Sequence, residues 1–417
     1  MQKPISIFFS FVLCVGCALA SVGCDGKDDV KTPDENGGNS VVESIDLVSD
    51  GVSDYTLVCQ TELSNDIKFM AASLRTATGA SFRTGTNAYT KAHEILIGTG
   101  RDCEAAVKGL LHGYVIKAVG ERIIIAGTDI CWTVLGMEAF MREVRSRSGS
   151  SSISFPGSLN IVEDPEDAQL IATFLREERK FTLEAESVGV CKGENVIKYA
   201  QGAASDGKYV FFALRAGEDP NGIVYKYTLH PFALVDKTGV FSCYHANDMT
   251  YDSRRKKMIV AHSSGDPYGY TLLDVETMER TEVKTSFYTS GIAYNAKDDV
   301  FGITHSGSKY MLSNADFNKT VKDYGRSDGM SDTYCAQGMG SDDSYVYFPM
   351  SPIKDISTDN VLVVYGWDGK YIDTLHLPIT YESETMFYAA GDYYIVFNRG
   401  GASLYRLIPV ISFDPSK

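Results

Sequence analysis

Five polar residue pairs recur at near-constant spacing in the second half of this chain. Their first members stand at positions 201, 247, 290, 337 and 384, which are 46, 43, 47 and 47 residues apart. The pairs are Gln201-Gly202, Asn247-Asp248, Ser290-Gly291, Gln337-Gly338 and Glu384-Thr385. Amide and carboxyl side chains form hydrogen bonds to sugar hydroxyls or to an amidated peptide, and two carboxylates together can hydrolyse a glycosidic bond. This chemistry requires a fold that brings the pairs together.

Each pair is followed by a turn or a charged stretch and then by an apolar run that is rich in strand-forming residues. The runs are Tyr209–Leu214, Met258–Ala261, Val300–Thr304, Tyr345–Met350 and Tyr393–Asn398. A repeat of this length built from short strands is typical of a β-propeller, with one four-stranded blade per repeat. We therefore predict a five-bladed β-propeller over residues 181–417.

The fifth repeat is incomplete. Asp392–Asn398 and Ser403–Val410 supply its second and third strands, and the chain then nearly ends. An outer edge without a partner strand would be exposed. Phe181–Val190 precedes the first repeat and has no partner of its own, so we predict that it closes the ring as the outer strand of the fifth blade.

In a propeller the openings of the repeats meet at one end of the axial channel. This predicts one ligand-binding site formed by Gln201, His245, Asn247, Asp248, Gln337 and Glu384. The alternative is structural, because polar groups on innermost strands also bond to neighbouring blades or to channel water. Asp248 and Glu384 are weaker candidates for catalytic carboxylates. No cofactor is expected, and no zinc-ligand spacing occurs in the mature chain.

Residues 42–163 have the pattern of a smaller domain. Glu62–Thr76 and Asp129–Val144 carry helical apolar stripes, and Asp129 or Thr128 is placed to cap the second helix. Strands are expected around them, including Glu94–Gly98 and a hairpin that turns at Gly120. The pattern predicts a small α/β sandwich with helices on one face of a sheet, followed by a charged connector over residues 164–180. The connector holds one short helical stripe, and we expect its charged face to be solvated.

Several segments of this domain occur in the order found in a known module. They are Leu74 with Thr78-Gly79, then Glu94–Gly98, Gly113–Ile116 and Ile123–Gly127. They resemble the non-catalytic N-terminal domain of hexosaminidase-type and α-glucuronidase-type glycoside hydrolases, which implies a carbohydrate-associated architecture. Those enzymes continue into a (β/α)₈ barrel, whereas a propeller is predicted here. No functional residue is therefore carried over from this resemblance.

The propeller half resembles a family of bacterial surface propellers. The resemblance lies in Ala200–Gly202, Asp206–Tyr209, His245–Tyr251 and Gly291–Tyr294. It is also similar, more distantly, to the five-bladed plant-type glutaminyl cyclases, which bind substrate in a tryptophan-containing cage with a catalytic Glu. This chain has only Trp132, outside the predicted propeller, and Trp367, in a predicted blade turn. We therefore expect no such cage.

The N-terminus has the pattern of an export signal. Ile5–Ala20 is almost wholly apolar and follows Lys3. Ser21–Cys24 resembles the bacterial lipoprotein processing site, which implies a lipid on Cys24; Cys17 is a second candidate. A plain cleaved signal and an uncleaved membrane anchor are the alternatives. Residues 24–41 are polar and acidic, which predicts a flexible tether.

The net charge limits the classes of binding partner, and the cysteine spacing indicates the state of the thiols. The 417 residues carry a formal net charge of -15, which argues against nucleic acid, because its phosphates require a basic surface. Six cysteines follow the export segment, widely spaced and without a CxxC motif. Disulfides are possible in an exported protein, but we predict buried free thiols.

Together these features predict a cell-surface or periplasmic lipoprotein, anchored to the membrane through its N-terminal lipid. We expect it to bind carbohydrate or peptide at the propeller mouth without turning it over. One alternative is an enzyme, either a glycosidase or a glutaminyl-cyclase-like transferase that uses axial carboxylates. The other alternative is a scaffold for protein–protein interaction.

Overall fold

The structure is a computed structural model that describes residues 42–86, 92–98, 102–217, 219–264, 268–285, 287–305, 309–326, 333–354 and 357–417. The predicted signal peptide and tether, with Cys17 and Cys24, lie outside the described residues. No helix within the described ranges is long and apolar enough to cross a bilayer.

The residues before the propeller form a six-stranded mixed sheet in the order β3-β2-β4-β6-β5-β8. Its strands are β2 (Thr56–Cys59), β3 (Arg83–Thr86), β4 (Glu94–Gly98), β5 (Tyr114–Val119), β6 (Arg122–Gly127) and β8 (Asn160–Glu163). The pairs among β3, β2, β4 and β6 are parallel, and β5 is antiparallel to both its neighbours. A separate antiparallel pair joins β1 (Ser44–Val48) to β7 (Ile153–Pro156).

Helices cover this sheet. α1 (Ser64–Thr78), which follows a 3-10 turn η1 (Thr61–Leu63), and α3 (Ile130–Ser146) share one core with the strands. The predicted cap is confirmed, because the Asp129 carboxylate accepts a hydrogen bond from the Trp132 amide at 3.0 Å. A short helix that was not predicted, α2 (Asp102–Ala106), packs in a separate cluster with Val58, Leu96 and Ile124. The helices therefore lie on both faces and not on one, because alternate side chains of β2, β4 and β6 point to opposite sides.

The connector contains α4 (Leu170–Arg176). Its apolar residues follow the predicted helical stripe, and Ile171, Ala172 and Leu175 pack against propeller strands. Arg179 then forms a buried ion pair with Glu138 of α3, with 2.6 Å between Nη2 and Oε1. The charged connector is thus partly a packed element, whereas the sequence had suggested a solvated surface.

The second half is the predicted five-bladed β-propeller, each blade an antiparallel sheet. Blade 1 contains β10 (Ile197–Ser205), β11 (Tyr209–Ala216), β12 (Asp219–Thr228) and β13 (Ala233–Lys237), and β14 (Phe241–Ser242) also pairs with β12. Blade 2 contains β15 (Asp248–Asp252), β16 (Lys257–Ala261), β17 (Gly269–Asp274) and β18 (Arg280–Lys284). Blade 3 contains β19 (Gly291–Asn295), β20 (Val300–His305), β21 (Lys309–Asn314) and β22 (Thr320–Arg326).

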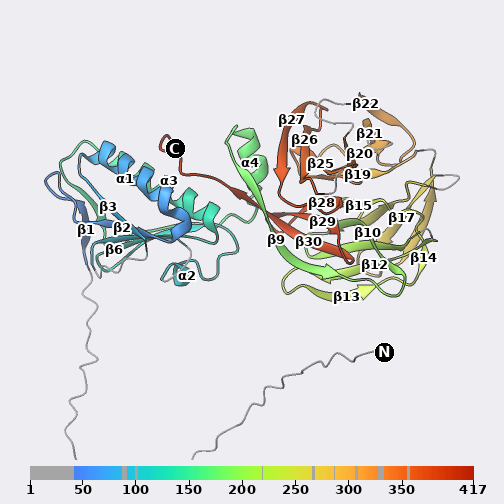
Figure 1. Ribbon diagram of the computed structural model, residues 1–417, viewed down its shortest axis with the longest axis horizontal. Coiled ribbons are helices and arrows are strands. Elements are labelled where there is room, and N and C mark those ends of the chain that lie inside the picture. The colour runs from blue at the N-terminus through green and yellow to red at the C-terminus, as the bar shows by residue number, and fades with distance from the viewer. Residues whose placement is uncertain are drawn as a thin grey trace, which may run out of the picture. The chain divides into compact units, whose positions relative to one another are not determined.

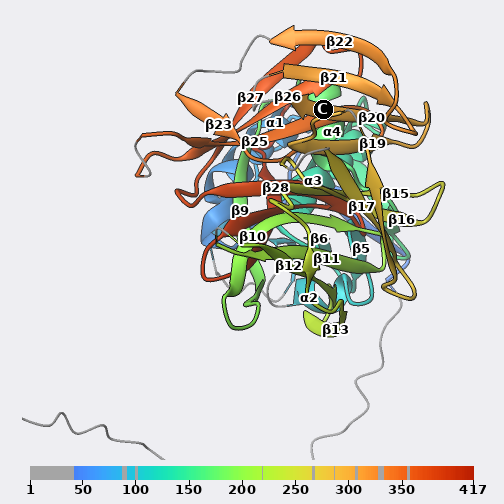
Figure 2. The ribbon, with the colours of Figure 1, turned by 90° about the vertical axis from the view of Figure 1, so that its right-hand side faces the viewer.

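Blade 4 has an interrupted innermost strand, made of β23 (Tyr334–Ala336) and β24 (Gly340–Ser341), followed by β25 (Tyr345–Pro352), β26 (Asn360–Gly366) and β27 (Tyr371–Leu377). Blade 5 contains β28 (Ser383–Ala389), β29 (Asp392–Asn398), β30 (Ala402–Val410) and β9 (Thr182–Cys191). The innermost strands contact one another in the order β10, β15, β19, β24, β28 and back to β10, around the axis (Figure 2).

The predicted closing strand is confirmed. β9, which comes first in the chain, pairs antiparallel with β30, which comes last, and Figure 1 shows the green and red strands side by side. Cys191 lies opposite Ala402, and Thr182 lies opposite Val410. The pairing covers the edge that β30 would otherwise expose, so the two ends of the propeller complete one sheet.

The cysteines of the described residues are mostly buried. Cys59, Cys131 and Cys191 are free thiols with almost no exposed surface, as predicted. Burial raises the pKa of the Cys59 and Cys191 thiols to about 11 in each case. These thiols are therefore protonated packing groups at neutral pH.

A leucine on the closing strand tests how much this pairing stabilises the ring. Leu183 is 3% exposed and packs with β26, β27, β29 and β30, whereas Leu234 on the outer strand of blade 1 is 52% exposed. We expect Leu183→Ala to lower the free energy of unfolding in urea by about 2–4 kcal/mol. Leu234→Ala, the matched control, should change it by less than about 0.5 kcal/mol. Equal effects of the two substitutions would contradict a packed closing strand.

Candidate ligand-binding site

The openings of the five repeats meet at one end of the propeller axis. A pocket of about 770 Å³, here called the mouth pocket, lies where the innermost strands begin. It is lined by Tyr199, Gln201, Arg215, Gly217, His245, Asn247, Ser263, Tyr288, Gln337, Glu382, Glu384 and Asn398. Five of the six predicted site residues are among them, and Asp248 is not.

Asp248 is fully buried on the axis and ties four blades together. Its Oδ1 accepts hydrogen bonds from the Met249 amide at 2.8 Å and the Thr385 hydroxyl at 2.6 Å. Its Oδ2 accepts from the amides of Ile292 at 2.7 Å and Met339 at 2.9 Å. Because both oxygens are engaged and the side chain does not line the pocket, Asp248 is a structural residue. The pairing of Asp248 with Glu384 as catalytic carboxylates stays a prediction, and of the two only Glu384 lines the mouth pocket.

The protonation of Asp248 depends on two opposing effects. Burial raises the pKa of this carboxyl from 3.8 to about 8, and the four hydrogen bonds oppose that rise. The Thr385 hydroxyl also lies 3.1 Å from the Met339 carbonyl oxygen, where it can donate instead. A protonated Asp248 could then donate to Thr385, so the same arrangement suits both protonation states.

The glycines of the repeated pairs allow the innermost strands to approach this carboxyl closely. A Cβ on Gly202 would lie 2.5 Å from the Asp248 carbonyl carbon. A Cβ on Gly338 would lie 2.4 Å from the Glu384 carbonyl oxygen and 2.8 Å from the Asp248 carboxylate. Any side chain at these positions would force the blades apart, which explains why glycine follows glutamine at both.

The predicted amides have mixed roles. Asn247 donates through Nδ2 to the Ser290 carbonyl at 2.8 Å and to the Gln337 carbonyl, so it links three repeat openings. Gln201 donates to the carbonyl of Ala200 at 2.5 Å. Gln337 donates to Oε1 of Glu382 at 2.8 Å. The structural role that we weighed against ligand binding is therefore present for Asn247, while the other two amides are side chains of the pocket wall.

Two glutamates stand close in sequence at the start of β28, and both line the mouth pocket. Glu384 is 2% exposed, and its Oε1 has no hydrogen-bond partner among the described residues. Burial, reinforced by repulsion from Glu382, raises the pKa of Glu384 well above its ordinary value. Burial, reinforced by Arg215, lowers the pKa of His245. Both shifts favour the uncharged forms of these side chains.

The sequence had not indicated Arg215, Glu382 or Asn398 as pocket residues. Arg215 lies near the end of β11 and Asn398 ends β29, which are equivalent places on the second strands of blades 1 and 5. The polar residue at the end of an apolar second strand is the signal that could have identified them. His262 follows the equivalent strand of blade 2 but is buried, bonded to the Thr271 hydroxyl at 2.8 Å, with a pKa that burial lowers to about 4.

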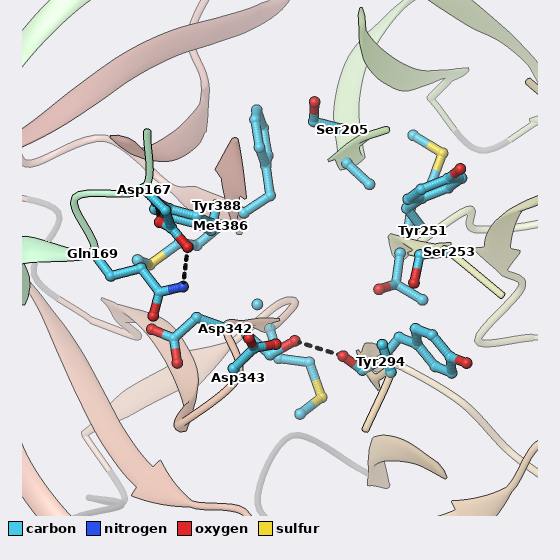
Figure 3. A pocket seen from close by; sticks show the side chains of 18 residues that line it. Asp167, Gln169, Ser205, Tyr251, Ser253, Tyr294, Asp342, Asp343, Met386 and Tyr388 are labelled. Atoms are coloured by element: carbon cyan, nitrogen blue, oxygen red, sulfur yellow. Dashed lines mark hydrogen bonds between the residues drawn. The ribbon is translucent and has the colours of Figure 1, made fainter. Parts of the chain in front are cut away.

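A smaller pocket of about 280 Å³, the turn-side pocket, lies at the opposite ends of the innermost strands (Figure 3). The connector contributes Asp167 and Gln169, which are hydrogen-bonded at 2.8 Å. Asp342 is held by the hydroxyls of Tyr347 at 2.5 Å and Tyr393 at 2.6 Å. The polar groups here bond mainly to each other, so the mouth pocket is the stronger candidate site.

Known proteins of similar structure share little sequence with this chain. No protein-family model matches the sequence, and no curated protein matches it. The chain is similar to a glutaminyl cyclase of Myxococcus xanthus, with 8% identity over 55% of this chain and 98% of that one, and a TM-score of 0.42. It is also similar to the tail fiber of Staphylococcus aureus phage P68, with 10% identity over 55% of this chain and 53% of that one, and a TM-score of 0.38.

A third similar structure is a structural genomics protein of unknown function from Bacteroides thetaiotaomicron, with 10% identity over 62% of this chain and 81% of that one, and a TM-score of 0.36. The likenesses are too weak to carry an argument about activity. The chain is a five-bladed β-propeller preceded by a mixed α/β sheet. The resemblance of residues 42–163 to glycoside-hydrolase N-terminal domains stays a prediction. Neither Trp132 nor Trp367 is among the described residues that line the mouth pocket.

Removing the Asp248 carboxyl tests its role as the central tie. In Asp248→Ala three buried backbone amides lose their acceptor, at about 1–3 kcal/mol each, so we expect a loss of several kcal/mol in unfolding free energy. Asp248→Asn keeps one acceptor oxygen and should lose less than half as much. The measurement is equilibrium urea unfolding. If Asp248→Ala has the same unfolding free energy as wild type, the blades hold together without this carboxyl.

Proposed function

We propose that the mouth pocket binds carbohydrate without turning it over. The observation that supports this most directly is a wide polar pocket lined by two side chains that each carry a buried hydrogen-bonding atom without a protein partner. Among the described residues these atoms are Oε1 of Glu384 and Nε of Arg215. A buried polar atom without a partner costs about 1–3 kcal/mol, so a ligand that supplies the missing bonds is favoured.

The lining favours a sugar over a peptide. Amides, carboxyls and a guanidinium supply donors and acceptors to hydroxyl groups, and the rings of Tyr199 and Tyr288 supply apolar faces. Tyr199 is 42% exposed, and Tyr268 packs edge-on against Tyr288 with 5.3 Å between ring centroids. Peptide recognition more often uses an open sheet edge or an apolar groove. The mouth pocket has neither character.

The absence of turnover rests on the position of Asp248. A glycosidase needs two carboxyl groups that reach the same bond. Because Asp248 does not line the mouth pocket, Glu382 and Glu384 are the two carboxyl groups of the pocket that would have to act on the bond. Glu382 already accepts from Gln337 at 2.8 Å and from Asn398 at 3.4 Å, which favours a positioning role.

An aromatic residue of the pocket tests carbohydrate binding. We expect Tyr199→Ala to weaken the binding of a neutral tetrasaccharide roughly fivefold, because about 1 kcal/mol of ring contact is lost. Tyr251→Ala is the matched control, because Tyr251 lines the turn-side pocket. The measurement is isothermal titration calorimetry with cellotetraose, maltotetraose, xylotetraose and chitotetraose. Failure of wild-type protein to bind any of them would refute the proposal, and binding of a partner protein instead would favour the scaffold alternative.

We also propose that the chain is exported and anchored in a bacterial membrane through a lipid on Cys24. The supporting features are the apolar segment Ile5–Ala20 and the Ser21–Cys24 sequence that follows it. The polar residues after Cys24 would then act as a spacer between the membrane and the folded part. Their acidic groups repel an anionic lipid surface.

The anchor can be tested with two cysteines of the same segment. We expect Cys24→Ala to abolish labelling by radioactive palmitate and to release the protein from the membrane fraction. Cys17→Ala should leave both unchanged, since Cys17 lies inside the segment that is removed. The reverse result would move the lipid to Cys17, and labelling of neither cysteine in the wild type would refute the anchor.

A further inference from the structure

We infer that Glu384 binds the ligand as an uncharged carboxylic acid. Its Oε1 donates a hydrogen bond to an oxygen atom of a neutral oligosaccharide, and ionisation of Glu384 releases the sugar. This rests on the proposed function of the mouth pocket and adds to it the charge class of the ligand and a control by pH.

The position of the side chain supports this inference. Glu384 lies at the start of β28, is 2% exposed and still lines the pocket. Its Oε1 has no hydrogen-bond partner among the described residues. A negative charge buried there is unfavourable because its Oε1 has no donor, whereas a carboxylic acid leaves only an O–H group to be satisfied. A ligand oxygen in the pocket can accept from that group.

The charged neighbours of Glu384 also favour its uncharged form. Glu382, next to it on the chain, and Asp248, on the axis, both oppose its ionisation, and only Arg215 on β11 favours ionisation. The thiol of Cys335 on β23 also interacts with both glutamates, and burial raises its pKa, which favours the neutral thiol over a thiolate. A hydrogen bond with Asn398 lowers the pKa of Glu384, but it offsets only part of the rise that burial causes.

The same charges define the ligand. With Glu384 and His245 uncharged, the charged groups of the pocket wall are the Glu382 carboxylate and the Arg215 guanidinium, which offset each other. An uncharged sugar therefore enters without a net electrostatic penalty. Because the two charges offset each other, an acidic sugar gains no net electrostatic attraction from the wall, and we expect it to bind no more tightly than a neutral one.

The charge state of Glu384 can be measured without any ligand. We expect the infrared difference spectrum between wild type and Glu384→Gln, at neutral pH, to show the C=O stretch of a protonated carboxyl group. Glu279→Gln, a substitution of an exposed glutamate between β17 and β18, is the control and should show only loss of an ionised carboxylate. An ionised-carboxylate signal for Glu384 would overturn the inference whatever the pocket binds.

The binding experiment uses calorimetry with the same neutral tetrasaccharides and with tetragalacturonate, from mildly acidic to mildly alkaline buffer. For wild type we expect the affinity for a neutral sugar to fall about tenfold as pH rises, which is the loss of one hydrogen bond of about 1.4 kcal/mol. Glu384→Gln should keep the acidic-pH affinity throughout, because an amide N–H can donate in place of the acid. Glu384→Ala should be about tenfold weaker at every pH.

The outcomes separate the inference from the proposed function. If no neutral tetrasaccharide binds wild type at any pH, the proposed function itself fails. If a sugar binds but its affinity is independent of pH, or if Glu384→Gln binds as weakly as Glu384→Ala, the inference fails and the proposed function stands. Tighter binding of tetragalacturonate would also overturn the inference. The Asp248 carboxyl is still present in Glu384→Gln, so a pH dependence that disappears in that variant requires Glu384.

Discussion

The propeller depends on one buried carboxyl group that satisfies donors from four blades. Asp248 accepts from Met249 beside it and from Ile292, Met339 and Thr385 of the next three blades. Backbone amides at the centre of a ring have no strand partner on the axial side, so without an acceptor they would be buried and unsatisfied. The two oxygens of one carboxyl meet this requirement for four of the five blades.

The same hydrogen bonds place the mouth pocket. Each group that bonds to Asp248 stands one or two residues after the first member of a repeated pair: Thr385 follows Glu384, and Met339 comes two after Gln337. The pocket side chains are therefore attached to backbone that the central carboxyl holds in place. A site positioned in this way needs little ordering when a ligand binds, which reduces the entropic cost of association.

The architecture could be predicted from the sequence because it follows from spacing. A repeat near 46 residues and apolar runs of strand length indicated the blades, and the unpaired third strand at the chain end indicated the closing strand. The residues that line the mouth pocket could not be predicted in the same way, because neighbouring residues of a strand point to opposite sides of the sheet. Asn247 lines the pocket while Asp248 lies inside the axis, and spacing does not distinguish them. Arg215 and Asn398 come from the ends of second strands, outside the five repeated pairs from which the site was predicted.

The pairing of β9 with β30 also constrains the order in which the propeller can fold during synthesis. Blade 5 is divided between the first and last segments of the propeller, which are separated by the four other blades. During synthesis, β9 emerges first and has no sheet to join until β30 has been produced. Earlier blades can form their local hairpins meanwhile, but the ring is sealed by a contact of very long sequence separation, which is slow to form. Until then β9 and the inner edge of the first blade stay without their final partners, where chaperones or another unfinished chain can bind.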